Sequence, residues 1–218
     1  MAYIKNDSNA FLVGTSLDDT LDGSSSFFQQ ELYGGLGNDT YLINASGGDI
    51  VVERPGEGTD TLILIGFGSS FLTQALPDNV ENLTVQPGLP APSGFGITGN
   101  GLNNVITTAG GDDDLDGGAG NDTLIGGAGN DTYHVDASAD VVTEAANGGW
   151  DIVYTSASYT MPANVEVLVL TGSAAINATG STGNDIIVGN AGANAINGLA
   201  GNDILQGFGG NDVLNGDL

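Results

Sequence analysis

Residues 117–135 read GGAGNDTLIGGAGNDTYHV, and this stretch decides the fold. A nine-residue unit, glycine-rich, then acidic, then apolar, occurs twice in succession with almost no change. Each unit offers a single apolar anchor, which is too little for a conventional packed core. A chain of this kind must gain its shape by stacking one unit on the next.

The phase of this unit continues along the chain in steps of nine residues. An oxygen-bearing side chain recurs at Asn104, Asp113, Asp122, Asp131 and Asp140, and again at Asp185, Asn194, Asp203 and Asp212. An apolar residue follows each of them two positions later, as Leu124 follows Asp122. Looser spacings keep the same pairing after Asp19, Asp39, Asp49, Asp60, Glu81, Asp151 and Glu166.

An offset of two residues places both side chains on the same face of a short strand. The apolar side chain points inward, and the carboxylate marks where the strand leaves a turn. Glycines before it, as at Gly126, Gly127 and Gly129, permit the positive φ angles of a tight turn. Each nonapeptide is then half of a coil of eighteen residues. Stacked coils predict an all-β fold, a parallel β-solenoid with a thin apolar interior.

A larger repeat is also visible. Residues 34–53 match residues 126–144, and NVEN (79–82) matches NVEV (164–167). We therefore expect a degenerate leading coil at 1–32, a first module at 33–125 and a second module at 126–218. An insertion around FGSSFLTQALPDN (67–79) and the proline-rich PGLPAP (87–92) are expected to leave the stack.

The charge of the chain calls for a cation. It carries 27 acidic residues against Lys5 and Arg54, a formal net charge of −25, and 37 glycines. Charge repulsion and the entropy of the glycines both oppose folding. The 40% apolar content nevertheless argues against permanent disorder. The same charge disfavours nucleic acid and anionic membrane surfaces as partners.

Stacked coils bring carboxylates together, because residues eighteen apart lie above one another at about 4.8 Å. The expected pairs are Asp113 with Asp131, Asp122 with Asp140, Asp185 with Asp203, and Asn194 with Asp212. Calcium accepts six to eight oxygens in a loose geometry, including the backbone carbonyls of glycine turns. Magnesium demands a tighter octahedron and is the weaker candidate.

The run GGAGNDTLI GGAGNDTYH fits the pattern G-G-x-G-x-D-x-U-x and resembles the RTX (hemolysin-type calcium-binding) repeats. The resemblance implies a right-handed parallel β-roll with several calcium ions between successive turns. The implied ligands are Asp113, Asp122, Asp131, Asp185, Asp203 and Asp212, with Asp39, Asp140, Asn104 and Asn194 as further positions. The implied carbonyl donors are the turn glycines Gly117, Gly126, Gly129, Gly198 and Gly207.

Some positions depart from this pattern. Asn104 and Asn194 lack a charge, so their sites are expected to be weaker. The turns before Asp140 and Asp151 lack the first two glycines of the pattern, which leaves the roles of these two open. Glu81 and Glu166 precede strands directly and are expected to be solvated strand ends.

No pattern points to catalysis. His134 is the only histidine, and we expect it to face outward beside the inward Tyr133. One histidine without cysteine makes a zinc site implausible, and Lys5 stands outside any phosphate-loop pattern. Three aromatic residues that could suggest a carbohydrate platform are expected to pack in strands: Trp150, Tyr154 and Tyr159.

The sequence thus predicts a non-enzymatic calcium-binding roll of an exported bacterial protein that folds outside the cell. The N-terminus lacks a secretory signal pattern, which agrees with the type I secretion implied by the resemblance, and no apolar run is long enough to span a membrane. Two alternatives stay open: an adhesive or ice-binding solenoid, and a non-catalytic fragment of a larger RTX enzyme or toxin. The chain stops in a glycine turn without a cap, so we also consider attachment to a larger protein or self-association.

Overall fold

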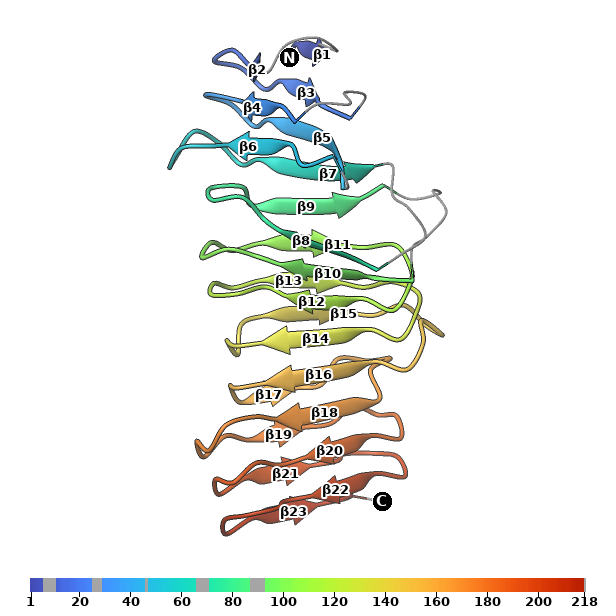
Figure 1. Cartoon of the computed structure of the whole chain (residues 1–218). Helices are drawn as coiled ribbons and strands as arrows, with labels where there is room; N and C mark the ends of the chain where they lie inside the picture. Colours follow the sequence, from blue (N-terminus) through green and yellow to red (C-terminus); the bar gives the residue numbers. More distant parts are fainter. Residues whose placement is uncertain (6–10, 25–28, 46, 66–70, 87–92, 218) are drawn as a thin grey trace.

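The computed structural model describes residues 1–5, 11–24, 29–45, 47–65, 71–86 and 93–217 (Figure 1). These residues form 23 short β-strands and no helix. The strands wind into one elongated stack of coils, and each coil supplies one strand to either face (Figure 1). The expected parallel β-solenoid is confirmed.

The odd-numbered strands make one face of the solenoid, as a sheet of eight strands followed by a sheet of four. Neighbours in both sheets pair in parallel. The first sheet contains β1 (Tyr3–Lys5), β3 (Thr20–Asp22), β5 (Thr40–Asn44), β7 (Thr61–Ile65), β9 (Asn82–Val85), β11 (Val105–Thr107), β13 (Thr123–Ile125) and β15 (Val141–Thr143). The second contains β17 (Tyr159–Thr160), β19 (Ala178–Thr179), β21 (Ala195–Asn197) and β23 (Val213–Asn215).

The even-numbered strands make the opposite face, as a sheet of three strands followed by one of eight. Their pairings are parallel as well. The short sheet contains β2 (Phe11–Val13), β4 (Glu31–Tyr33) and β6 (Ile50–Val52). The long sheet contains β8 (Leu72–Ala75), β10 (Phe95–Thr98), β12 (Asp114–Asp116), β14 (Thr132–Val135), β16 (Ile152–Thr155), β18 (Val167–Leu170), β20 (Ile186–Val188) and β22 (Ile204–Gln206).

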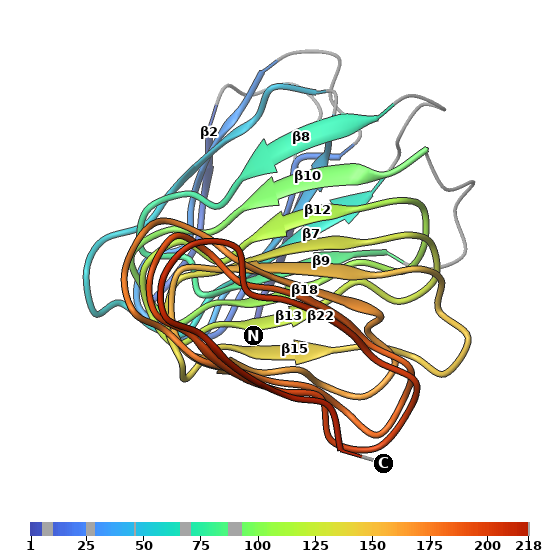
Figure 2. The same cartoon turned by 90° about the horizontal axis from the view of Figure 1, so that it is seen from below.

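The core is a narrow double column between the two faces. Viewed along the stack, the coils lie over one another around this interior, and they turn gradually from the N-terminal to the C-terminal end (Figure 2). The apolar residue that follows an acid is buried, as Leu124 and Tyr133 are, except in the last coil, where Leu205 is half-buried and Leu214 exposed. Register stacks Leu124 on Ile106 and Tyr133 on Leu115. Each such side chain contributes about 1.5–3 kcal/mol by leaving water, so the pairing rule read from the sequence is what builds the core.

The turn glycines have two different structural roles: some adopt positive φ angles, and others leave space for a neighbouring side chain. Gly127 and Gly129 adopt φ angles of +98° and +138°, as the tight turn requires. Gly126, expected to share this conformation, is not among the positive-φ residues, so that expectation is wrong. Its lack of a side chain matters instead, because an added Cβ would collide with Asp131 and Tyr133.

The expected insertion at 67–79 is also corrected for its described part. Residues 72–75 form β8, which pairs with β10 in register and belongs to the stack. The sequence did not indicate this strand, because β8 stands at the end of its sheet, buries few side chains and therefore lacks a clear apolar pattern. The stretch PGLPAP lies outside the described residues. Both long sheets run across residue 125 without interruption, and the division into modules stays a prediction.

Among the described residues there is no helix with the length and apolar character needed to cross a bilayer.

Candidate metal centres

The turns form two columns, one along each edge of the solenoid. We call the loops that lead from an even-numbered strand to the next odd-numbered strand the even-to-odd edge, and the others the odd-to-even edge. The even-to-odd edge carries Asp19, Asp39, Asp60, Glu81, Asn104, Asp122, Asp140, Asn194 and Asp212. The odd-to-even edge carries Asp49, Asp113, Asp131, Asp151, Glu166, Asp185 and Asp203.

A ladder of hydrogen bonds joins the acids of each column. The backbone N–H of Asp113 donates to Oδ1 of Asp131 at 2.8 Å, and the N–H of Asp131 donates to Oδ1 of Asp151 at 2.8 Å. The other predicted pairs are joined in the same way: Asp122 to Asp140 at 3.0 Å, Asp185 to Asp203 at 3.1 Å, and Asn194 to Asp212 at 2.9 Å. The predicted neighbours are confirmed, and each acid uses one oxygen to hold the coil before it.

Glu81 and Glu166 correct an expectation. Both are half-buried rather than solvated strand ends. The N–H of Asp60 donates to Oε2 of Glu81 at 2.7 Å, and the N–H of Asp151 donates to Oε2 of Glu166 at 2.8 Å. A longer side chain therefore continues the ladder where the glycine turn is missing.

The second carboxylate oxygen is the atom that fits a cation. Within the described residues, six aspartates have a buried Oδ2 without a hydrogen-bond partner: Asp39, Asp113, Asp122, Asp131, Asp151 and Asp203. A buried anionic oxygen is costly unless something positive compensates it. Asp151, whose role the sequence left open, belongs to this group and is fully buried.

In four of the six, Asp39, Asp122, Asp131 and Asp203, this oxygen faces the first glycine of its turn, five residues earlier. Thr108 and Ala146 stand at that position before Asp113 and Asp151. A Cβ added to Gly117 would collide with Oδ2 of Asp122, and the same holds for Gly126 with Asp131 and for Gly198 with Asp203. Gly207 stands in the same relation to Asp212. The first glycine thus keeps open the space beside the carboxylate, and an oxygen-lined space of this kind suits calcium.

Burial and mutual repulsion disturb the ionisation of these acids. Burial raises the pKa of Asp113 to about 6 and that of Asp131 to about 7, and neighbouring carboxylates act in the same direction. Burial likewise raises the pKa of Asp122 and of Asp151. A divalent cation would relieve both effects by supplying the missing positive charge.

At other predicted positions, hydrogen bonds within the protein already satisfy the side-chain oxygens. Oδ1 of Asn194 accepts the N–H of Asn190 at 2.9 Å, while its Nδ2 donates to the Ile176 carbonyl at 2.7 Å. Both oxygens of Asp185 accept from Ser181, at 2.6 and 2.9 Å. Asn104 makes the same contacts as Asn194, and Oδ2 of Asp140 accepts two backbone N–H groups. In these turns, hydrogen-bond donors of the protein compensate the side-chain oxygens that a cation would otherwise compensate.

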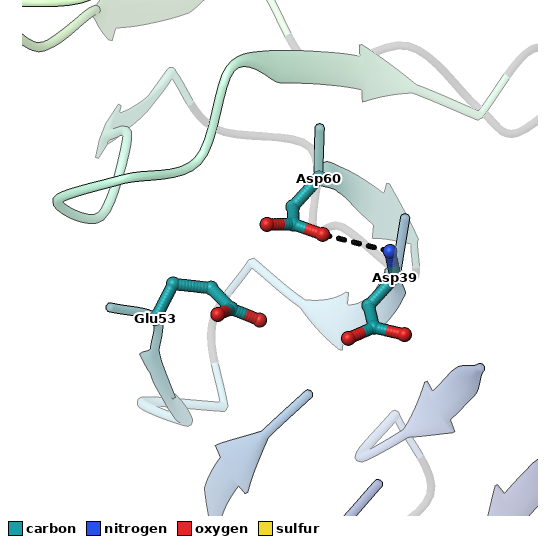
Figure 3. Close-up of side chains that lie close together, drawn as sticks. All are labelled: Asp39, Glu53 and Asp60. Carbon is teal, nitrogen blue, oxygen red and sulfur yellow. Dashed lines mark hydrogen bonds between the residues drawn. The ribbon is translucent and has the colours of Figure 1, made fainter. Parts of the chain in front are cut away.

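Two further groups of acids each gather three carboxylates: Asp39 with Glu53 and Asp60, and Asp131 with Glu144 and Asp151. One oxygen from each member lies within 4.8 Å of the others. Figure 3 shows Glu53 facing Asp39 and Asp60 across the turn. The sequence reasoning missed both glutamates, although each ends one of the two matching segments, 34–53 and 126–144.

The structure also places His134 and the aromatic residues that the sequence singled out. His134 is exposed as expected; its Nε2 lies 2.9 Å from Oδ1 of Asp114, and its ring stacks on Tyr154 at 5.7 Å between centroids. Tyr159 packs inside as expected. Trp150 does not, since 52% of it is exposed, so that expectation is wrong.

Comparison with known families agrees with this geometry. Four segments match the RTX calcium-binding nonapeptide repeat, at residues 31–41, 98–142, 177–205 and 188–218. Searches of the curated proteins and of the solved structures gave no match. The matched segments include five of the six aspartates with an unpartnered Oδ2, all but Asp151.

Proposed function

Since the chain is an RTX calcium-binding nonapeptide repeat protein, we propose that it is a β-roll that folds outside the cell when calcium fills its turns. The observation that carries the proposal is the set of buried, unpartnered Oδ2 atoms along both edges. Four of these atoms, those of Asp39, Asp122, Asp131 and Asp203, lie in turns whose first glycine leaves room beside the carboxylate.

Asp39, Asp113, Asp122, Asp131, Asp151 and Asp203 would hold the ions through Oδ2, and Asp212 would add a half-buried site. The turn glycines Gly117, Gly126, Gly129, Gly198 and Gly207 would contribute carbonyl oxygens, as hard cations prefer. Bound calcium supplies the positive charge that two basic residues cannot. Asn104, Asn194, Asp140 and Asp185 are weaker candidates, because hydrogen bonds already close their turns.

Metal binding is then coupled to folding. A net charge of −25 opposes the compact state, and the thin core offers limited compensation. Extracellular calcium modules bind at about 10⁻⁴–10⁻³ M, far above cytosolic calcium. Such a chain would stay unfolded inside the cell and become ordered after export.

The repeats support a structural role rather than catalysis, since the RTX roll is a calcium-binding scaffold. An adhesive or ice-binding face would need a long regular array of side chains. The outward threonines Thr20, Thr40 and Thr61 do stack, but Asn82 and then Val105 end the column. No observation favours this second function.

Far-UV circular dichroism tests the proposal. The full chain is first measured in EGTA and then titrated with Ca²⁺, with Mg²⁺ as the matched control ion. We expect a disordered spectrum that becomes β-rich with calcium and responds much less to magnesium. A β spectrum that is already complete in EGTA and unchanged by calcium would contradict the proposal.

A further inference from the structure

We propose that the two acidic groups, Asp39–Glu53–Asp60 and Asp131–Glu144–Asp151, are cation sites of a second type, which bind calcium more tightly than the nonapeptide turns. The inference rests on the proposed function, because it concerns the same ion. Asp39, Asp131 and Asp151 are the aspartates named above as ligands of the turns, and at these places a glutamate joins them that belongs to no nonapeptide aspartate position. We call these groups the glutamate sites.

The register explains how each glutamate reaches its site. Tyr33 of β4 pairs with Val52 of β6, so the next residues, Gly34 and Glu53, lie one coil apart at the same height of the turn. Ile125 of β13 pairs with Thr143 of β15, which places Glu144 over Gly126 in the same way. A carboxylate thus stands where the repeat otherwise carries its first glycine, and it extends toward the aspartates of two successive coils.

The distances suit a single ion. One oxygen from each of the three acids lies within 4.8 Å of the others. Calcium binds oxygen at 2.3–2.6 Å, so two ligands on opposite sides of one ion are at most about 5.2 Å apart. Three oxygens at such separations can surround one ion after at most a small adjustment of their side chains.

Unpartnered oxygens point into both sites. In the described chain, Oδ2 of Asp39 and Oε2 of Glu53 have no hydrogen-bond partner, and these residues are 1% and 7% exposed. Oδ2 of Asp131 and of Asp151 are in the same state, at 1% and 0% exposure. Three buried acids that leave two such oxygens without a partner require either protons or a cation.

Each glutamate is held in place by the same two partners. The hydroxyl of Tyr41 donates to Oε1 of Glu53, and that of Tyr133 donates to Oε1 of Glu144. Nδ2 of Asn79 donates to the backbone carbonyl of Glu53 at 2.9 Å. Asn164 does the same for Glu144 at 3.1 Å. Both asparagines adopt positive φ, 64° and 66°, so the clamps share one backbone conformation.

The two glutamate sites lie on opposite edges of the solenoid. Asp39 and Asp60 belong to the even-to-odd edge, whereas Asp131 and Asp151 belong to the odd-to-even edge. The same acids, tyrosine and asparagine therefore recur in two different surroundings. Because the same set of side chains recurs on both edges, we infer that its members act together in binding one ion.

Charge sets the expected order of filling. A nonapeptide turn offers one aspartate from each of two coils, while a glutamate site offers three carboxylates to one ion. Affinity of calcium sites rises with the number of charged ligands. The glutamate sites should thus fill at the lowest calcium concentration, and they should favour trivalent lanthanide ions even more strongly.

Terbium luminescence gives a direct readout, because the tyrosine beside each glutamate can sensitise a Tb³⁺ ion bound there. The experiment uses the full chain carrying Trp150→Phe, which removes the only tryptophan, an exposed residue. We expect tyrosine-sensitised emission to appear with the first two equivalents of Tb³⁺ and calcium to displace it. The paired substitution Glu53→Gln and Glu144→Gln should abolish this first phase and lower the calorimetric calcium stoichiometry by two ions, one for each site.

Glu31→Gln is the matched control, because Glu31 also accepts a tyrosine hydroxyl, that of Tyr33, but belongs to neither group. It should leave both measurements unchanged. If the paired glutamine variant does not fold in calcium, the same two measurements are made on the variant that carries Tyr41→Phe and Tyr133→Phe. These substitutions keep every carboxylate, so stoichiometry should persist while the emission is lost.

Two results would overturn the inference. One is a folded glutamine variant that binds as many calcium ions as its parent. The other is sensitised emission that survives the tyrosine substitutions. Either result would leave the calcium roll itself intact, whereas a parent chain that binds no calcium would remove the proposed function as well.

Discussion

Asn100 and Asn104 bind each other across one turn in both directions. The backbone N–H of Asn100 donates to Oδ1 of Asn104 at 2.8 Å, and Nδ2 of Asn104 donates to Oδ1 of Asn100 at 3.1 Å. Asn190 and Asn194 repeat the arrangement at 2.9 and 3.0 Å. In these two turns a side-chain amide makes the contacts for which we propose a calcium ion in the other turns.

The substitution Asn194→Asp should therefore make its turn depend on calcium. The new carboxylate loses the Nδ2 donor to the Ile176 carbonyl and adds a charge, which costs about 1–3 kcal/mol of unfolding free energy. Urea unfolding at the lowest calcium that sustains folding should show this loss. At saturating calcium the loss should shrink, because an ion can replace the donor; an equal loss at both concentrations would contradict the explanation.

The first glycine of a turn should tolerate no side chain. Gly117→Ala places a Cβ against the carboxylate of Asp122, and overpacking of this kind typically costs about 1–3 kcal/mol. Gly101→Ala is the control, because its Cβ would meet nothing within 4 Å and its φ needs no glycine. Urea unfolding in saturating calcium should separate the two variants. Similar stabilities would mean that the space beside the carboxylate is not required.

Without calcium, the chain should fold better in mild acid than at neutral pH. Burial raises the pKa of Asp131 and of Glu144 to about 7 from ordinary values near 4, so the folded state binds protons more tightly than the unfolded state. This contribution is present at about pH 4–5 and is lost as the pH rises through about 7. Circular dichroism in metal-stripped buffer at pH 4.5 and 7.5 measures the effect.

Calcium should reverse that pH dependence, since the ion and the protons compete for the same oxygens. Calcium added at pH 6.5 should release protons, which potentiometric titration can count. Folding in metal-stripped buffer that improves from pH 4.5 to 7.5 would contradict the assignment of raised pKa values.

The positions Leu199 and Phe208 carry backbone strain. They stand second in their turns, where Gly127 stands in its own, and adopt φ angles of 68° and 60°. Phe208 is 66% exposed, so its side chain gains little from packing. Phe208→Gly should stabilise the calcium-loaded chain by about 0.5–1 kcal/mol, because the strain of about 1–2 kcal/mol exceeds the entropy cost of glycine. Phe208→Ala, which keeps the strain, should give no gain in thermal denaturation.

Much of the fold could be predicted because its unit is local. The two-residue offset between Asp122 and Leu124 fixes which side chains face inward, and the nine-residue step fixes the coil. The stacking of Asp113 on Asp131 follows from counting eighteen residues. These relations need no knowledge of distant parts of the chain.

The rest depends on coils of other lengths. Asp39 reaches Asp60 after 21 residues, and Asp131 reaches Asp151 after 20, so counting in eighteens loses the register. The position of Glu53 above Gly34 follows only from the strand pairing. Likewise, Nδ2 of Asn104 donates to the carbonyl of Glu81, 23 residues earlier in the chain. The sequence therefore indicated calcium but not which acids retain an oxygen for it.

The parallel stacking of the coils also has a mechanical consequence. Each eighteen-residue step, as from Asp113 to Asp131, advances the chain by one strand spacing of about 4.8 Å along the axis. The same eighteen residues pulled straight span about 60 Å. If calcium holds the coils together, its removal turns a short stiff rod into a tether that can extend more than tenfold, and the distance between the two ends becomes a measure of the calcium around it.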